Sequence, residues 1–329
     1  MTSKRSRIIL IVVAGILLLL CAIVAGTYWA VGPALRCNRP AQGPAEPGWS
    51  VRTVISDGLE RCYYLYAPPS YDPAQPTPLV LSFHGFLSNP SSHALITKWH
   101  QLADEEGFLV VYPQGTQFPQ QWEAGPAWGP GADDVQFFLD MLTDVSSVTS
   151  VDPARIYVNG FSNGGGMTEF IGCEAADQVA AIGTVAAAVA TTQDCDPARP
   201  VPAMVFHGTA DPVVLYDGGK VEHKIMRRIA ESVDGPTNFV AARDWVGMWT
   251  QRNGCDPASK AMETPEGVRG WHATGCDDNA YVIFYAVEDG GHTWPGGLPI
   301  PGVGKTSKEI SATEEMWRFF QAHSLDAQP

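Results

Sequence analysis

The sequence is poor in basic residues and lacks clustered metal ligands. Its 329 residues include 21 Lys and Arg against 35 Asp and Glu, for a formal net charge of −14 at pH 7. Nucleic-acid-binding proteins present basic patches to phosphates, so this balance argues against a nucleic-acid partner. The 8 His and 7 Cys are scattered without the spacing of a metal site, and we expect no metal and no cofactor.

Internal repeats, low-complexity blocks and a separate substrate-binding module are also lacking. Apolar strand-like runs alternate instead with helical segments, which indicates an α/β fold with a mostly parallel sheet and helices on both faces. Roughly 290 residues beyond the N-terminal segment suit one such domain. The helices that we expect are Ala94–Glu106, Asp134–Leu142, Gly164–Cys173, Thr237–Gln251 and Thr313–His323.

The N-terminal segment predicts export. Three basic residues precede an uncharged run from Ile8 to Val31, and the core of that run would span about 28 Å as a helix. We predict a cytoplasmic stub and membrane signal anchor over residues 1–32, a Pro/Gly-rich linker over 33–50 and a single globular domain over 51–329 outside the membrane. A cleaved signal peptide and a secreted domain are the alternative.

One motif predicts a nucleophile. A β-branched and aromatic run ends in Gly160-Phe161-Ser162-Asn163-Gly164, and small, helix-compatible residues follow. A Gly-x-Ser-x-Gly pentapeptide between a strand and a helix forms a sharp turn that exposes the serine hydroxyl. Glycine is needed on both sides because a Cβ atom would clash in so tight a turn.

Candidate partners of Ser162 follow in order. Asp211 comes after the apolar strand 202–206, and His292 comes after the strand 281–287. The order Ser, Asp, His is that of the α/β-hydrolases. Asp211 could instead start a turn before Pro212, and Asp289 is a rival carboxylate on the histidine's own loop.

A turn after the strand 78–83 predicts oxyanion donors. His84-Gly85-Phe86 resembles an oxyanion turn, so the backbone N–H groups of Phe86 and Asn163 are the expected pair. A plain His-Gly turn is the alternative.

Seven segments resemble the secreted esterase family that contains polyhydroxybutyrate depolymerases and feruloyl esterases, with relatives among acetyl xylan esterases. They are Tyr64–Tyr71, Phe83–Gly85, Val111–Gly115, Asp133–Phe137, Gly160–Gly165, His207–Val214 and Gly290–Gly297. The resemblance implies that Ser162, Asp211 and His292 are the catalytic triad. The sequence differs from the pattern of this family at two places. Phe86 stands where many relatives have Cys, and the partly basic segment 218–236 is a candidate insertion or lid.

Six cysteines outside the N-terminal segment are even in number, which permits disulfides in an exported domain. Fifteen connectivities are possible. Sequence proximity and the family resemblance favour Cys173–Cys195 and Cys255–Cys276, which leaves Cys37–Cys62.

Three tryptophans are candidates for the substrate pocket. Trp294 lies two residues beyond His292, and Trp122 and Trp128 lie in a Gly/Pro-rich loop where ordinary packing is an equal alternative. The neighbouring Asp133 and Asp134 are expected to cap a helix rather than to bind a metal.

Together these features predict a serine carboxylic ester hydrolase that acts through an acyl-enzyme on hydroxybutyrate-type or on feruloyl- and acetyl-polysaccharide esters. A serine peptidase of the same fold and a catalytically silent, membrane-anchored binding protein are the alternatives.

Overall fold

Ten strands of the described chain form one sheet with a mostly parallel centre. The computed structural model describes residues 37, 40–117, 119–128, 131–190 and 195–325. The strands are β1 Gly48–Ser56, β2 Leu59–Ala67, β3 Thr77–Phe83, β4 Leu109–Pro113, β5 Val151–Phe161, β6 Ala181–Val185, β7 Ala203–Gly208, β10 Lys260–Met262, β11 Val268–Ala273 and β12 Val282–Val287. A separate two-stranded sheet pairs β8 Gly219–Lys220 with β9 Asn238–Phe239.

The strand order is β1-β2-β4-β3-β5-β6-β7-β12-β11-β10. The six central strands from β4 to β12 are parallel, whereas β1, β2, β11 and β10 pair antiparallel at the two ends. This arrangement confirms the predicted α/β-hydrolase fold. Parallel strands need covered faces, and the central strands are accordingly almost continuously buried.

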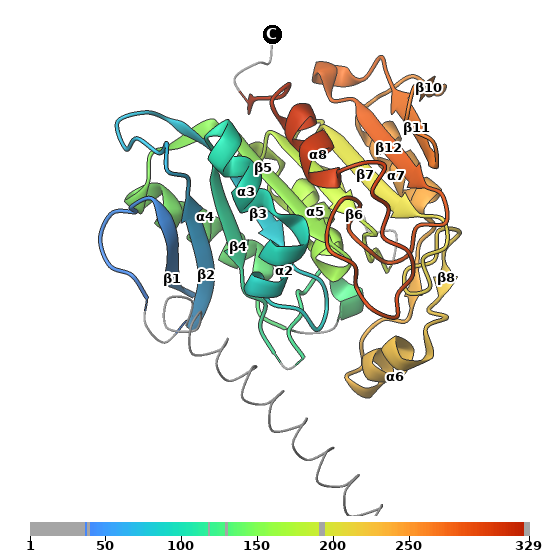
Figure 1. The fold of residues 1–329 in the computed structure, drawn as a ribbon, viewed down its shortest axis with the longest axis horizontal. Coiled ribbons are helices and arrows are strands. Elements are labelled where there is room, and N and C mark those ends of the chain that lie inside the picture. Colours follow the sequence, from blue (N-terminus) through green and yellow to red (C-terminus); the bar gives the residue numbers. More distant parts are fainter. Residues whose placement is uncertain (1–36, 38–39, 118, 129–130, 191–194, 326–329) are drawn as a thin grey trace, which may run out of the picture.

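Helices cover both faces of the sheet (Figure 1). They are α2 Pro90–Thr97, α3 Trp99–Glu106, α4 Asp134–Val148, α5 Asn163–Glu174, α6 Lys224–Ser232, α7 Ala242–Arg252 and α8 Ala312–Phe320, with 3-10 turns at Pro126–Trp128, Ala176–Gln178 and Asp277–Asn279. Helices α2, α3 and α8 pack on one face, and α4, α5 and α7 pack on the other.

Two helix predictions need correction. The helix expected over Ala94–Glu106 is two helices, because Lys98 adopts a left-handed φ of 59° between them and α2 already begins at Pro90, capped by the Asn89 side chain. The helix expected from Thr237 begins only at Ala242, because Asn238 and Phe239 pair with β8.

The helix predicted over Asp134–Leu142 runs on to Val148. Its next turn buries Val145 against the core, so tertiary contacts extend it. The predicted cap is confirmed, because the Asp133 side chain accepts a hydrogen bond from the Gln136 N–H at 2.8 Å.

The expected linker over residues 33–50 is partly built into the domain. The N–H of Ala41 donates to Val51 O at 2.7 Å, the N–H of Ala45 donates to Val148 O at 2.8 Å, and Ala45 is buried. The predicted anchor over residues 1–32 lies outside the described residues. Within the described ranges, no helix is long and apolar enough to cross a membrane.

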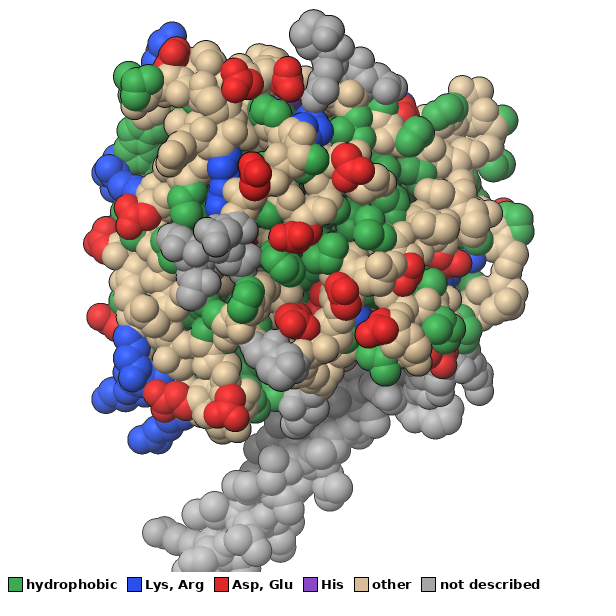
Figure 2. Space-filling view, turned by 180° about the vertical axis from the view of Figure 1, so that it is seen from behind, with side chains coloured by type: hydrophobic (Ala, Val, Ile, Leu, Met, Phe, Trp, Pro, Cys, Tyr) green, Lys and Arg blue, Asp and Glu red, His purple; other side chains and the backbone are tan. Residues whose placement is uncertain are grey.

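Charge is unevenly distributed on the face that carries α4, α5 and α7. Figure 2 shows acidic side chains spread across this side, with basic side chains gathered mainly at the margin where α6 lies. Helix α6 supplies Lys224, Arg227 and Arg228.

Candidate active site

The turn that holds Ser162 at the carboxyl edge of the sheet is tightly constrained. Ser162 lies between β5 and α5 with φ 56° and ψ −120°, a left-handed backbone conformation that a non-glycine residue rarely adopts. A Cβ on Gly160 would lie 2.1 Å from Gly164 O, and one on Gly164 would lie 2.2 Å from Phe83 O. Neither position can therefore accept a side chain, as the motif predicts.

Asp211 lies in the loop after β7, and its carboxylate accepts three hydrogen bonds. Oδ1 accepts from the N–H groups of Val213 at 2.8 Å and Val214 at 2.9 Å, while Oδ2 lies 2.7 Å from Nδ1 of His292. The Asp211 side chain is completely buried. Two backbone donors and an imidazole therefore fix its orientation.

His292 reaches Asp211 because β7 and β12 are parallel neighbours and their following loops meet. The loops approach so closely that a Cβ on Gly208 would lie 2.3 Å from Gly290 O. The N–H at Nδ1 donates to Asp211, which leaves Nε2 as the acceptor nitrogen. The ring packs 4.8 Å from the ring of Phe161, the residue before Ser162. The rival carboxylate, Asp289, is exposed.

A second histidine supports the aspartate loop. His207 Nε2 donates to Val214 O at 2.8 Å and lies 3.7 Å from Asp211 Oδ2. Burial lowers the pKa of His207, so the ring is neutral at pH 7. His207 therefore braces the Asp211 loop without adding a charge beside it.

The predicted oxyanion turn lies next to the serine turn. A Cβ on Gly85 would lie 3.2 Å from Ser162 Cβ, so the two turns are in contact. Within the described part of the chain, the backbone N–H groups of Phe86 and Asn163 meet no hydrogen-bond acceptor. Both groups are therefore free to bind an oxygen at the site.

A small, mostly apolar pocket that is open to solvent adjoins Ser162. Apolar groups dominate its lining, which consists of Phe86, Trp128, Ser162, Ala188, Val213, Val214, Val221, Met226, Ala230, Gly235, Pro236 and Phe239. Five of these residues belong to the segment 218–236, which the sequence suggested as an insertion or lid. That segment, which includes α6, therefore forms one wall of the pocket.

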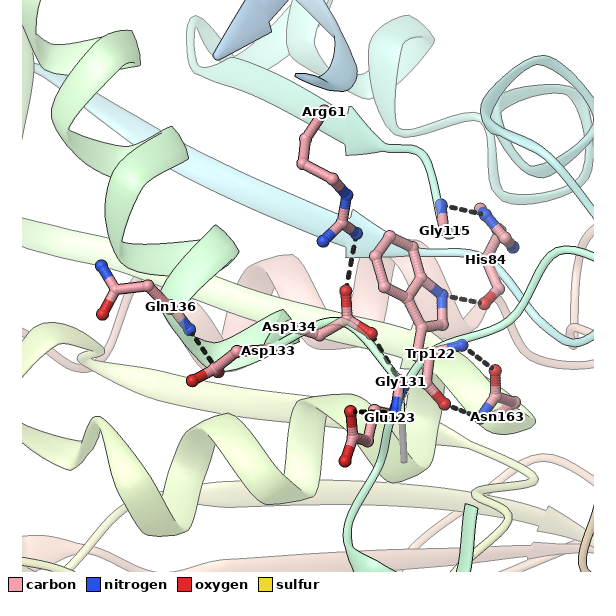
Figure 3. A network of polar contacts seen from close by, with 10 residues as sticks. All are labelled: Arg61, His84, Gly115, Trp122, Glu123, Gly131, Asp133, Asp134, Gln136 and Asn163. Carbon is pink, nitrogen blue, oxygen red and sulfur yellow. Dashed lines mark hydrogen bonds and ion pairs between the residues drawn. The ribbon is translucent and has the colours of Figure 1, made fainter. Parts of the chain in front are cut away.

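Of the three predicted pocket tryptophans, the structure places Trp128 alone in this lining. Trp294 turns into the core instead, where its Nε1 donates to Thr313 Oγ1 at 2.9 Å. Trp122 is also fully buried, and its Nε1 donates to His84 O at 2.8 Å (Figure 3). Expecting Trp122 and Trp294 to line the pocket is therefore wrong, because each indole is directed to a buried acceptor.

The sequence profile of the family described as "Esterase PHB depolymerase" matches residues 61–237, more than half of the chain. The chain belongs to this esterase family. The match includes the Ser162 turn, the Asp211 loop and the wall formed by residues 218–236.

Individual relatives of this chain have names that agree with the family. Feruloyl esterase B of Piromyces equi is 32% identical over 232 residues, which are 68% of this chain and 41% of that protein. The chain thus spans less than half the length of that relative. Probable feruloyl esterase C of Aspergillus niger is 29% identical, over 88% of this chain and 96% of that protein.

A solved structure, the acetyl xylan esterase from Aspergillus awamori, matches this chain with a TM-score of 0.56 and 15% identity. The match covers 83% of this chain and 99% of that one. At this identity the likeness concerns the fold alone.

The disulfides of the described chain are Cys37–Cys62, Cys173–Cys195 and Cys255–Cys276. All three pairs predicted from the sequence are confirmed. Cys37–Cys62 ties the start of the described chain to β2, and Cys173 lies on α5, which begins directly after Ser162.

Sequence reasoning missed two features of the site. The first is the buried ion pair between Asp134 and Arg61, which no local pattern indicates because 73 residues separate the partners. The second is the contribution of α6 to the pocket, for which the amphipathic pattern around Met226 is the available signal. In the described residues, no group of three or more His, Cys, Asp or Glu is placed to hold a metal.

Proposed function

We propose that this esterase is a serine carboxylic ester hydrolase that acts through an acyl-enzyme. The observation that most supports the proposal is the 2.7 Å hydrogen bond between His292 Nδ1 and Asp211 Oδ2 beside the strained Ser162 turn. A nucleophile, a base and an orienting carboxylate are the groups that acyl transfer needs.

In the proposed reaction, Ser162 Oγ attacks the ester carbonyl carbon while His292 Nε2 takes the hydroxyl proton. Asp211 holds the imidazole in the required tautomer and stabilises its positive charge. The N–H groups of Phe86 and Asn163 bind the carbonyl oxygen as it becomes negative. His292 then protonates the leaving alcohol, and water, activated by the same histidine, releases the acid and restores Ser162.

The pocket supports an uncharged acyl group as the part of the substrate that is bound. The described residues of its lining include no charged side chain, and burying an unpaired charge there would cost free energy. Relatives named feruloyl esterase and the family name itself suggest feruloyl- or acetyl-polysaccharide esters and hydroxybutyrate-type esters as substrates. We propose these classes for this chain.

We also propose that the domain works outside the cell. Three disulfides suit an oxidising compartment. The basic residues and apolar run of residues 1–32 would hold the domain at the outer side of the membrane, or release it if they are cleaved as a signal peptide.

The test is hydrolysis of p-nitrophenyl butyrate by the full chain and by Ser162→Ala. We expect turnover to fall by several orders of magnitude in the variant, with an unchanged circular dichroism spectrum. A fluorogenic peptide amide assayed in parallel detects a peptidase. Equal, negligible rates of both folded proteins on every substrate would favour the silent binding protein instead.

A further inference from the structure

Trp122 joins the two segments that carry the proposed oxyanion donors. Its N–H donates to Asn163 Oδ1 at 2.8 Å, and its carbonyl accepts from Asn163 Nδ2 at 3.0 Å. Its indole N–H donates to the carbonyl of His84 at 2.8 Å. Figure 3 shows the indole N–H directed at His84 and the Trp122 backbone facing the Asn163 side chain. One residue thus holds the start of α5 and the start of the oxyanion turn at a fixed separation.

The loop over residues 114–123 holds the same turn at two further points. The N–H of Gly115 donates to His84 Nε2 at 3.0 Å, and the N–H of Leu87 donates to Gln120 O at 3.0 Å. Burial lowers the pKa of His84 to about 4, so its ring remains neutral at pH 7 and Nε2 remains an acceptor. The turn around Phe86 is therefore held on both sides.

The loop is in turn anchored by a buried ion pair. Asp134 Oδ2 accepts from the N–H of Glu123, the residue after Trp122, at 2.7 Å. Asp134 Oδ1 pairs with Arg61 Nη2 at 2.6 Å, and the two side chains are 1% and 2% exposed. The Arg61 guanidinium also lies 3.9 Å from the ring centroid of Phe137. Strand β2, helix α4 and the loop thus meet at one carboxylate.

A buried ion pair is a costly way to stabilise a fold, because desolvation offsets most of the Coulombic attraction. Burial raises the pKa of Asp134, and the charge of Arg61 and the N–H of Glu123 oppose this rise. An apolar pair of similar size would fill the same space. What an apolar pair could not supply is the carboxylate oxygen that fixes the backbone of Glu123.

We infer that Trp122 is a positioning residue for the oxyanion hole, and that Asp134 and Arg61 hold it in place. This inference rests on the proposed function. Donors to an oxyanion must lie about 2.7–3.1 Å from the oxygen in the transition state. Loss of the indole hydrogen bond removes one of the contacts that hold the turn at His84, so the N–H of Phe86 is less well aligned when negative charge develops.

The decisive variant is Trp122→Phe in the full chain, which keeps an aromatic ring and removes the indole N–H. We expect kcat for p-nitrophenyl butyrate to fall about 10- to 100-fold, less than for complete loss of a donor, while KM changes less than about twofold. The matched control is Trp245→Phe. Trp245 is also buried, but among the described residues its Nε1 has no hydrogen-bond partner, so kcat should stay unchanged.

A thionoester substrate distinguishes misaligned oxyanion donors from a general loss of activity. Sulfur accepts hydrogen bonds weakly, so an aligned oxyanion hole favours the oxygen ester over p-nitrophenyl thionobutyrate. We expect the ratio of oxygen to sulfur rates to fall in Trp122→Phe in proportion to kcat and to stay unchanged in Trp245→Phe. A lower kcat with an unchanged ratio would overturn the inference.

A second pair of variants tests the role of the Asp134–Arg61 ion pair. It also provides a test if Trp122→Phe does not fold. Asp134→Ala removes the acceptor of Glu123, whereas Asp134→Asn keeps a side-chain oxygen there. We expect a lower kcat and a lower oxygen-to-sulfur ratio in Asp134→Ala, with partial recovery in Asp134→Asn. The control is Asp133→Asn, because Asn is an equally good helix cap.

The outcomes distinguish this inference from the proposed function. Wild-type turnover that is not abolished by Ser162→Ala would sink both. Turnover that depends on Ser162, together with wild-type kcat in folded Trp122→Phe and Asp134→Ala, would sink the positioning role alone.

Discussion

His292 and Asp211 are 81 residues apart in the chain, yet His292 Nδ1 lies 2.7 Å from a fully buried oxygen of Asp211. Two backbone N–H groups hold the other oxygen of the same carboxylate. The pair therefore has one orientation, with Nε2 of His292 left as an acceptor.

Asp211→Asn tests the importance of this orientation. The amide can donate to Nδ1 and so favour the wrong imidazole tautomer, and we expect kcat to fall about 10⁴-fold with little change in the unfolding midpoint. The measurement is p-nitrophenyl butyrate turnover. The control is Asp289→Asn on the exposed rival carboxylate, which should retain full activity. Loss of activity in the control alone would transfer the orienting role to Asp289.

The wall formed by α6 predicts a change in acyl-chain preference. Met226 lines the pocket, so Met226→Trp should fill it and lower kcat/KM for p-nitrophenyl hexanoate about 10-fold or more relative to the acetate. The adjacent Ile225 is 66% exposed, and Ile225→Trp should leave the ratio unchanged. If Met226→Trp and Ile225→Trp have the same ratio of kcat/KM for the hexanoate to kcat/KM for the acetate, the acyl chain does not bind in this pocket.

Thiol titration tests the disulfide pattern. With the six cysteines outside the N-terminal segment paired, the denatured, unreduced protein should show no reactive thiol from this set. Three or more would contradict the pairing. Replacing Cys255 and Cys276 together by Ser should lower the free energy of unfolding by about 3 kcal/mol, because the bond closes a loop of about 20 residues. Urea denaturation measures this change.

Glu169 on α5 predicts a pH dependence of stability. It is buried, its Oε2 accepts from Trp249 Nε1 at 2.6 Å, and burial raises its pKa well above the ordinary value of a glutamate. The folded state therefore binds this proton more tightly than the unfolded state. The resulting stabilisation is complete below the unfolded pKa and is lost as the pH rises through the folded pKa.

Glu169→Gln keeps the acceptor oxygen and removes the titration. The wild type should therefore lose stability relative to this variant as the pH rises from 4 to 8, which urea denaturation at each pH measures. Glu174 is at the exposed end of the same helix. The stability of Glu174→Gln should therefore change with pH in the same way as that of the wild type. If the difference in free energy of unfolding between the wild type and Glu169→Gln does not change with pH, the pKa of Glu169 is not raised.

The sequence predicted the features that depend on local backbone geometry. The Gly-x-Ser-x-Gly turn needs two glycines whatever surrounds it, and the structure leaves no space for a Cβ at Gly160 or Gly164. The Asp133 cap is also local, and it is present. The three disulfides followed from proximity and family resemblance.

Predictions failed where packing overrode a local pattern. The helix around Lys98 is interrupted because α2 and α3 each pack separately on the sheet, and the left-handed residue between them permits the change of direction. Trp294 follows the candidate base closely in sequence, yet Thr313 on α8 supplies a buried acceptor that draws the indole into the core.

The sequence by itself determined the order of Ser162, Asp211 and His292 and the loops in which they lie, because strand ends and glycine turns are encoded by neighbouring residues. The tertiary structure alone decided which carboxylate meets the imidazole, which walls enclose the pocket, and how Trp122 and the Asp134–Arg61 pair hold the oxyanion turn. These contacts join segments tens of residues apart. Their geometry depends on strand order and helix packing, and no spacing along the chain encodes it.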